Sequence, residues 1–271
     1  MGKKTLNRNK KENPPKRWDK IIGAVTLLTI VIFGFIIYND YNGSSSKTAS
    51  VNAEKNTVKQ TESEKVTKAE TDTKKNFNRT QVQGNPTVCI DAAHGGSSTG
   101  GASGNYTEKA ITLSVALKVK EYLEESGVNV VMTRTSDKDV TNEQRVKTCN
   151  DSKASAMVSI HMNSADKTVT AKGAECWVHT KKPADSQKLA EDILKQLKSE
   201  AGFNDRGVKY GTVADNKENY YINSHSLCAS MVLQLGFITD STDVKLVTDK
   251  LDTTATAIAD GIVEYLNGKA H

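Results

Sequence analysis

Apolar positions along this chain follow the periods of buried strands and of helices. Residues 87–91 form a short apolar run that ends before a cluster of glycines, which predicts a buried strand. Apolar and aromatic residues then recur at spacings of four, four and three, as on one face of a helix: Ile111, Val115, Val119 and Tyr122. This spacing predicts a helix over about 107–126, and Gly127 follows it as a C-terminal glycine should.

The same alternation continues to the end of the chain. Further strands are predicted at 128–133, 156–160, 173–178 and 230–235, and helices from 141, over 183–201, and from 241 and 250. The helix from 141 opens with the Thr-x-x-Gln spacing of a capping box. Such alternation predicts an α/β fold, a single domain with a mostly parallel sheet flanked by helices. Residues 202–219 are polar and irregular, and we interpret them as a long loop of the kind that is often functional.

A continuous apolar segment at residues 21–38 precedes this domain. It carries no charged side chain, and its length is at the lower end of what a helix needs to cross a bilayer. Residues 1–20 are rich in Lys and Arg, and a basic flank stays in the cytoplasm. We therefore predict a basic cytoplasmic tail at 1–20, a transmembrane anchor at 21–38 and an exported remainder. A cleaved signal peptide is the alternative, but no small-residue cleavage site closes the apolar segment.

The charge of the chain is concentrated at its N-terminus. The formal net charge is +5, and residues 1–20 supply +6 of it, so the remainder sums to −1. This excludes a basic surface for nucleic acid on the outer part. Residues 39–85 are mostly polar and charged, a composition that predicts a disordered extracellular linker. Residues 86–271 then remain for one domain with a full core.

Four cysteines follow the apolar segment: Cys89, Cys149, Cys176 and Cys228. An even number outside the membrane allows three disulfide pairings. However, each cysteine lies in or beside an apolar pattern and none forms a C-x-x-C pair. A domain of this size also needs no covalent staples, so we favour buried thiols.

Two histidines follow strand-like runs. His94 comes after the run at 87–91 and His161 after the run at 156–160, so a parallel sheet brings both to one edge. Glu108 is the first residue of the helix that follows the glycine loop, so we expect it to lie at the same edge of the sheet. Two imidazoles and one carboxylate are a ligand set that catalytic zinc uses while one position stays open for water. The glycines around His94 let the backbone adopt positive φ and approach a metal. The alternative is a glycine turn beside a histidine with ordinary hydrogen bonds.

Four motifs occur in a characteristic order: I-D-A-A-H-G-G, V-S-I-H-M-N, R-G-V-K and L-G-F-I-T-D. With Glu108 after the first motif, they resemble the zinc-dependent N-acetylmuramoyl-L-alanine amidases of the type 3 family, from residue 88 to about 266. The resemblance implies a six-stranded α/β domain, a Zn²⁺ cofactor bound by His94, Glu108 and His161, and peptidoglycan as the partner. It also implies hydrolysis of the amide between muramic acid and the L-alanine of the stem peptide.

The chain departs from this family at one position. The family has a catalytic glutamate directly before L-G-F, and this chain has Gln234 there. A neutral amide cannot take a proton, although it can still orient water, so we expect a slowed hydrolase. Two substitutes for the missing base are Glu175, in the strand at 173–178, and His225. The alternatives are a solvent-facing or structural glutamate and a surface-loop histidine.

Three further polar residues are candidates for the site. Asn163 is expected to form a hydrogen bond with the backbone at the turn after His161. Arg206 is expected to bind a carboxylate of the stem peptide. Asp91 is expected to accept a hydrogen bond from the second ring nitrogen of His94. The sequence therefore predicts a membrane-anchored cell-wall amidase whose catalytic domain faces outwards. It indicates no particular protein partner. The alternatives are an impaired pseudo-amidase that binds peptidoglycan or a partner, and a zinc hydrolase of another amide, such as a stem-peptide peptidase.

Overall fold

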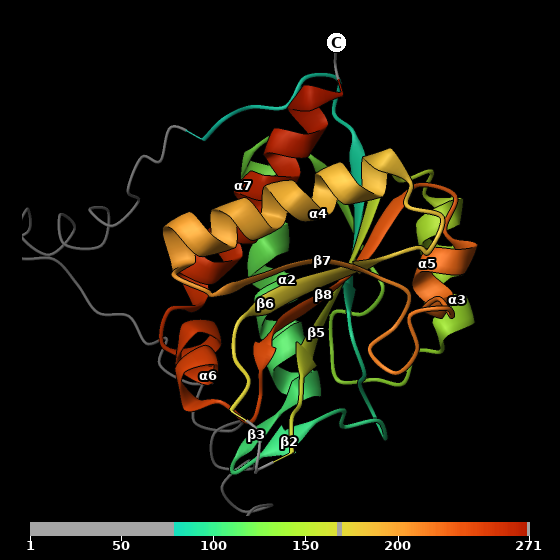
Figure 1. Ribbon diagram of the computed structural model, residues 1–271. Coiled ribbons are helices and arrows are strands. Elements are labelled where there is room, and N and C mark those ends of the chain that lie inside the picture. The colour runs from blue at the N-terminus through green and yellow to red at the C-terminus, as the bar shows by residue number, and fades with distance from the viewer. Residues whose placement is uncertain (1–78, 167–169, 270–271) are drawn as a thin grey trace, which may run out of the picture. The chain divides into compact units, whose positions relative to one another are not determined.

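A six-stranded sheet forms the centre of the domain (Figure 1). The computed structural model describes residues 79–166 and 170–269. The sheet strands are β1 (Thr87–Ala92), β4 (Asn129–Met132), β5 (Ala156–Asn163), β6 (Ala174–Val178), β7 (Asp205–Tyr210) and β8 (Ala229–Phe237). Their order is β4-β1-β5-β8-β6-β7, and neighbours run parallel except β8 and β6. The predicted single α/β domain with a mostly parallel sheet is confirmed.

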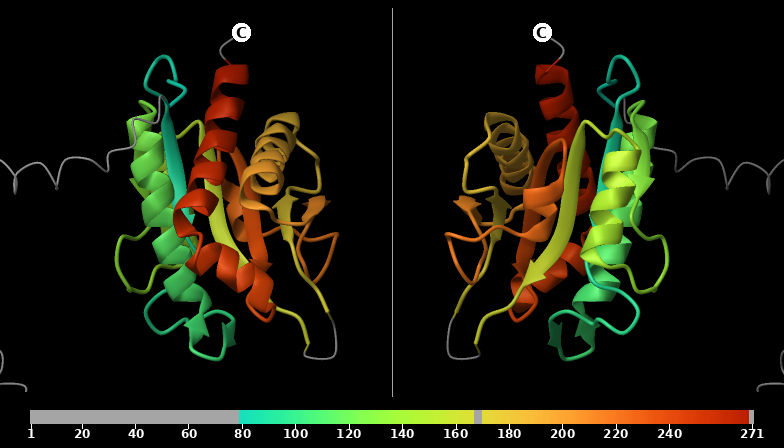
Figure 2. Two further views of the ribbon diagram at one scale, coloured as in Figure 1. Left: turned by 90° about the vertical axis from the view of Figure 1, so that its left-hand side faces the viewer. Right: turned by 90° about the vertical axis from the view of Figure 1, so that its right-hand side faces the viewer.

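Helices cover both faces of the sheet (Figure 2). They are α2 (Glu108–Glu125), α3 (Asn142–Asp151), α4 (Ala184–Gln196) with its π-helical continuation η1 (Leu197–Ala201), α5 (Tyr221–His225), α6 (Ser241–Thr248) and α7 (Leu251–Gly268). One layer contains α2, α4, α6 and α7, and the opposite layer contains α3 and α5. At the start of α3, Thr141 and Gln144 form the predicted capping box.

The segment at 202–219 differs from the prediction of a long loop, because it contains strand β7. This strand is mostly polar because it lies at the edge of the sheet, where only one neighbour covers it. Gly207, with a φ of 81°, further interrupts the alternation that identifies a strand. A small antiparallel pair, β2 (Ala102–Ser103) and β3 (Tyr106–Thr107), was also absent from the sequence prediction.

The two faces of the sheet bury different side chains. The larger apolar core lies under α2, α4, α6 and α7. The opposite face carries a smaller apolar cluster that includes Met157 and Val232 and packs against α3 and α5. Towards the carboxyl ends of β5 and β8 this face becomes polar. His161 is paired with Gln234 across β5 and β8, and Gln234 with Glu175 across β8 and β6, so the three side chains form one row.

All four cysteines are free thiols, as predicted. Cys89, Cys149 and Cys176 are buried, whereas Cys228 is partly exposed. The sulfur atoms of Cys149 and Cys228 lie 3.6 Å apart without a covalent bond.

The predicted tail at 1–20 and membrane anchor at 21–38 lie outside the described residues. None of the helices formed by residues 79–166 and 170–269 is long and apolar enough to cross a bilayer. Most of the predicted linker at 39–85 is also outside, but its last residues are described. There Val82 is buried and its N–H donates to the Ser126 carbonyl at 3.0 Å, so the domain begins before residue 86.

Candidate metal centre

Three predicted ligands converge at the carboxyl end of the parallel strands. His94 lies two residues beyond β1, Glu108 is the first residue of α2, and His161 lies near the end of β5. One nitrogen of each imidazole and one carboxylate oxygen lie within 4.8 Å of one another. Residues that are up to 67 positions apart in the chain thus form one set of atoms that could hold a metal ion.

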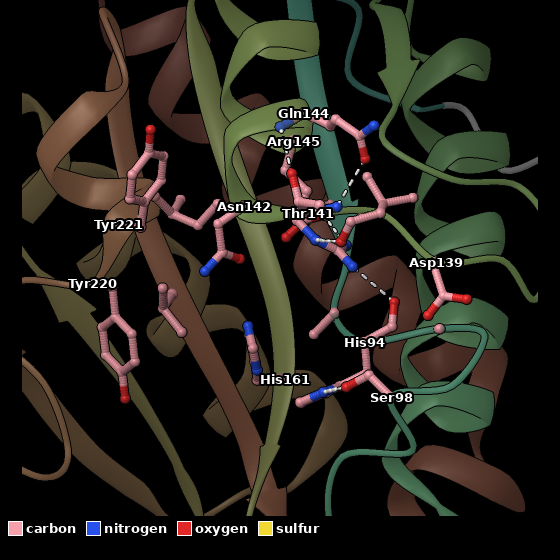
Figure 3. A pocket seen from close by; sticks show the side chains of 16 residues that line it. His94, Ser98, Asp139, Thr141, Asn142, Gln144, Arg145, His161, Tyr220 and Tyr221 are labelled. Atoms are coloured by element: carbon pink, nitrogen blue, oxygen red, sulfur yellow. Dashed lines mark hydrogen bonds and ion pairs between the residues drawn. The ribbon is translucent and has the colours of Figure 1, made fainter.

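The histidines face Glu108 from two sides. His94 Nε2 lies 3.1 Å from Glu108 Oε2, and His161 Nδ1 lies 3.1 Å from Glu108 Oε1. The imidazole rings are nearly perpendicular, at 79°, with centroids 5.4 Å apart. His94 Nδ1 is bonded to Ser98 Oγ at 2.9 Å (Figure 3). This second contact fixes the His94 ring so that Nε2 points at the centre.

Asp91 does not perform the predicted role as a partner of the His94 ring. Its carboxylate instead accepts hydrogen bonds from Thr133, Ser159 and Arg145. The prediction failed because Ser98, in the same glycine loop, forms the hydrogen bond to the His94 ring instead. No sequence pattern distinguishes Ser98 from other serines in turns.

Backbone amides hold the Glu108 carboxylate in place. Gly101 N–H donates to Oε2 at 2.8 Å and Met162 N–H donates to Oε1 at 2.9 Å. Burial raises the pKa of Glu108, but hydrogen bonds from His161, His94 and Gly101 outweigh burial, and the net pKa is well below its ordinary value. The carboxylate is therefore charged at neutral pH, as a metal ligand must be.

The glycine loop allows this close approach. A Cβ on Gly100 would lie 2.5 Å from Glu108 Oε2 and 2.6 Å from His94 Cδ2. Gly100 also has a φ of 66°, in the region that favours glycine. His94 itself has a φ of 60°, so the ligand sits on a turn that its surroundings must hold.

Two buried arginines, which the sequence analysis missed, hold that turn. Arg134 donates to the carbonyls of Ala92, Ala93, Ser136 and Lys109 and to the Thr112 hydroxyl. Arg145 donates to the His94 carbonyl at 2.8 Å and to Asp91 and Ala92 at 2.7 Å. Their exposed fractions are 1% and 5%. Together they bind three successive carbonyls, 92 to 94, and tie this turn to the start of α2.

Gln234 lies directly beside the metal centre. It is the cross-strand neighbour of His161 and is 6% exposed. Its Oε1 has no hydrogen-bond partner among the described residues. A buried amide oxygen without a partner is unfavourable unless the site supplies a donor when it is occupied. The role of Gln234 in the reaction stays a prediction.

Glu175 neighbours Gln234 on the other side, but its carboxylate is fully engaged. It accepts from Asn163 Nδ2 at 3.0 Å, from Trp177 Nε1 at 3.1 Å and from Arg206 Nε at 2.8 Å. These three donors, one of them the Arg206 guanidinium, occupy both carboxylate oxygens. The structure therefore favours a positioning role for Glu175 over the predicted catalytic one.

Asn163 and Arg206 meet at Glu175. Asn163 Oδ1 also accepts from Ser164 N–H at 2.9 Å, which holds backbone just after His161 as expected. Arg206 stacks over the Phe237 ring at 5.0 Å and keeps a side chain that is 37% exposed. Its contact with Glu175 is made through Nε. Contact of either residue with substrate stays a prediction.

A groove of about 660 Å³ opens beside the metal centre (Figure 3). It runs from His94 and His161 between the N-terminus of α3 and the start of α5, and its walls include Asn142, Tyr220 and Tyr221. His225, the second predicted substitute for the base, does not line this groove. Its ring stacks on Tyr221 with centroids 3.9 Å apart and bonds to Ser224, which is a structural role.

We expect the metal-free protein to lose stability in acid because of Glu108. A carboxyl whose folded-state pKa is lowered stabilises the fold above its unfolded value, near 4.5, and this contribution disappears as pH falls below it. Urea unfolding of the metal-free protein from pH 7 to pH 3 measures the loss. The Glu108→Gln protein is expected to have a lower free energy of unfolding than wild type at pH 7. Its free energy of unfolding should also fall less than that of wild type between pH 7 and pH 3. Parallel curves for the two proteins would contradict this assignment.

Comparisons with known proteins agree with this geometry. The family described as N-acetylmuramoyl-L-alanine amidase matches residues 88–264. YqiI, an uncharacterized Bacillus subtilis protein, is 37% identical over 182 residues, which cover 66% of this chain and 84% of YqiI. The B. subtilis N-acetylmuramoyl-L-alanine amidase LytC is 32% identical over 182 residues, covering 66% of this chain but 35% of LytC.

A solved structure shares the fold. The catalytic domain of CwlV, an N-acetylmuramoyl-L-alanine amidase from Bacillus (Paenibacillus) polymyxa var. colistinus, has a TM-score of 0.59 and 31% identity, covering 67% of this chain and 98% of that domain. The family match contains all three candidate metal ligands and Gln234. The chain therefore belongs to the N-acetylmuramoyl-L-alanine amidase family.

Proposed function

We propose that this protein is a zinc-dependent N-acetylmuramoyl-L-alanine amidase. Its reaction is hydrolysis of the amide between muramic acid and the L-alanine of the peptidoglycan stem peptide. The observation that carries the proposal is the convergence of His94, Glu108 and His161 beside an open groove in a chain of this family. Two imidazoles and one carboxylate fit zinc, which uses three protein ligands at catalytic sites and leaves a fourth position open.

The reaction needs a water molecule that attacks a carbonyl carbon. When bound, zinc supplies a Lewis acid that lowers the pKa of water to about 7 and polarises a carbonyl oxygen. Ser98 keeps the His94 ring in the required orientation, and the amides of Gly101 and Met162 hold Glu108. Gln234 neighbours His161 across β5 and β8, and its Oε1 has no partner within the described part of the chain. It can accept a hydrogen bond from the attacking water and orient it without removing its proton.

The inability of Gln234 to remove a proton from water predicts a slow enzyme. A positioned general base contributes about 10²- to 10⁴-fold to such reactions, and an amide does not replace that contribution. Glu175 does not compensate, because Asn163, Trp177 and Arg206 already donate to its two carboxylate oxygens. The proposed amidase therefore relies on the metal centre and on hydrogen bonds rather than on a carboxylate base.

Loss of a metal-binding residue tests the proposal. The purified protein is incubated with muropeptides, and mass spectrometry measures free stem peptide. His161→Ala is expected to lower both zinc content and the release of stem peptide, the latter by about 10²-fold or more. His225→Ala is the matched control, because it removes an imidazole outside the groove, and it should leave both unchanged. Equal activity of the two variants would contradict the proposal.

Gln234 favours a second candidate function, a pseudo-amidase that binds peptidoglycan without cutting it. The same experiment separates the two. Retention of muropeptide by a wild-type protein that releases no stem peptide would support the binding function. The masses of the products also identify the bond, because cleavage between two amino acids would instead indicate a stem-peptide peptidase.

We also propose that the domain acts outside the cell. The predicted anchor at 21–38 and the basic tail at 1–20 support this orientation. A random-coil linker of about 44 residues would have a root-mean-square span of roughly 35 to 40 Å, which carries the domain beyond the lipid surface. Protease added to intact cells is expected to degrade the domain. A domain protected until the cells are lysed would contradict this location.

A further inference from the structure

Cys149 and Cys228 form a pair of thiols outside the groove, and no step of the proposed reaction uses them. Cys149 lies in the last turn of α3, and Cys228 lies between α5 and β8. Their sulfur atoms are 3.6 Å apart. The sulfur atoms of a disulfide are about 2.0 Å apart, so each of these two would move by less than about 1 Å to form one. Side-chain movement of this size needs no rearrangement of the fold.

Asn150, the residue after Cys149, joins the two backbone segments that carry these thiols. Its Nδ2 donates to the His225 carbonyl at 3.0 Å, and its Oδ1 accepts from Leu227 N–H at 3.0 Å. The second of these hydrogen bonds ends directly before Cys228. In addition, α3 packs against α5, the helix that precedes this segment (Figure 1). Backbone contacts on both sides therefore hold the two cysteines next to each other.

One thiol of the pair can be reached from solution. Cys149 is buried, whereas Cys228 is partly exposed and lines a surface cavity of about 620 Å³. The contact with Cys149 and burial both raise the pKa of the Cys228 thiol. Because the thiolate is the reactive form, Cys228 reacts slowly at neutral pH and faster in mild alkali.

We propose that Cys149 and Cys228 are a redox-active pair that closes to a disulfide by exchange with a low-molecular-weight disulfide. The Cys228 thiolate attacks the reagent, so that a mixed disulfide forms and one thiol leaves. The Cys149 thiolate then attacks the Cys228 sulfur and releases the second thiol. Each leaving group takes up the proton that a protein thiol has lost. Two protein thiols are thereby oxidised, and one disulfide is reduced to two thiols. This chemistry is independent of the proposed amidase function.

The disulfide would hold α3, a helix that supports the candidate metal centre. The buried side chains of α3 are those of Arg145, Val146 and Cys149. Arg145 lies about one helical turn before Cys149 and donates to the His94 carbonyl at 2.8 Å. A covalent bond at Cys149 opposes local opening of this helix. Oxidation should therefore stabilise the fold and keep Arg145 at the turn that carries His94.

Oxidised glutathione is the reagent for the test. The purified protein is incubated with it at about pH 8.5, where thiolates are more abundant. Free thiols are counted after unfolding, and mass spectrometry identifies the linked peptides. We expect two of the four thiols to disappear and one peptide pair to join Cys149 to Cys228. A disulfide across a loop of this length should raise the Tm by roughly 5 to 10 °C, and dithiothreitol should reverse the rise.

Two variants show which thiols are responsible. Cys228→Ala is expected to abolish the rise in Tm on oxidation. Cys176→Ala, which removes a buried thiol from the larger core on the other face of the sheet, is the matched control and should retain it. The quantity compared is the difference in Tm between the oxidised and reduced forms of each protein. A loss of stability that affects both forms of a variant equally therefore does not alter the result.

Four results would overturn the proposal. The first is retention of all four thiols, and the second is a lasting mixed disulfide at Cys228, which would show that Cys149 does not reach it. The third is a bond from Cys149 to Cys89, a buried thiol of the same apolar cluster. The fourth is a Cys149–Cys228 bond that leaves the Tm unchanged, because the bond would then not hold α3.

Discussion

Gln234→Glu is expected to raise the kcat for cleavage of the muramoyl amide by about 10²- to 10⁴-fold. The position is already built for a catalytic group, since it neighbours His161 across β5 and β8 and its side chain is 6% exposed. A carboxylate there can accept the proton of the attacking water, which the amide cannot do. Turnover of a purified muropeptide by the two proteins at pH 7 measures the gain.

The environment of residue 234 also predicts the pH profile of this variant. An introduced carboxyl would be buried and would lie opposite Glu175 in β6, and both effects raise its pKa. The acidic limb of kcat should therefore lie above the ordinary glutamate value of about 4.3. Gln187→Glu, an equal change on α4 and away from the groove, is the control and should leave the rate unaltered. A Gln234→Glu protein that binds zinc but is no faster than wild type would refute the assignment of this position.

The sequence was most informative where periodicity and chemistry coincide. The apolar runs before His94 and His161 identified two neighbouring parallel strands, and parallel strands bring their carboxyl ends to one edge. For this reason the three candidate metal ligands could be placed together before their distances were known. Gln234 was identified differently, from the resemblance to a family that has a glutamate directly before L-G-F.

Other features could not be predicted because they depend on tertiary contacts. β7 is polar and interrupted by Gly207, so it does not have the alternation of a strand that is covered on one face. The role of Glu175 was obscured for a related reason. Period-two alternation places its side chain on one of two faces, but only the fold shows that Asn163, Trp177 and Arg206 occupy its oxygens.

The buried arginines are the clearest example of this limit. Arginine is mostly exposed in folded proteins, and the stretch around Arg134 reads as a polar turn. Arg134 nevertheless lies at 1% exposure and donates five hydrogen bonds, four of them to backbone carbonyls. Such a residue cannot be recognised from periodicity, because its partners are main-chain oxygens that every residue possesses.

Arg134→Met is expected to destabilise the protein and to weaken metal binding. The substitution would remove all five hydrogen bonds that Arg134 donates, and each typically contributes about 0.5 to 1.5 kcal/mol. For a domain of this size, a total loss of about 3 kcal/mol lowers the Tm by roughly 6 to 12 °C. The His94 turn, with its φ of 60°, would also be held less firmly. Groups that orient metal ligands typically contribute 10- to 100-fold to affinity, so zinc affinity should fall by about that factor.

Two further variants separate the geometric role of Arg134 from its charge. Arg134→Lys keeps the charge but offers three donors from one atom, so it cannot reach carbonyls on both sides of the turn, and zinc affinity should remain well below that of wild type. Lys147→Met removes a cation from the exposed face of α3, where Lys147 pairs with Asp151, and should change neither property measurably. Competition with a chelator gives the affinities, and differential scanning calorimetry gives the Tm values. If Arg134→Lys restored full zinc affinity, charge rather than the fork of donors would be what positions His94.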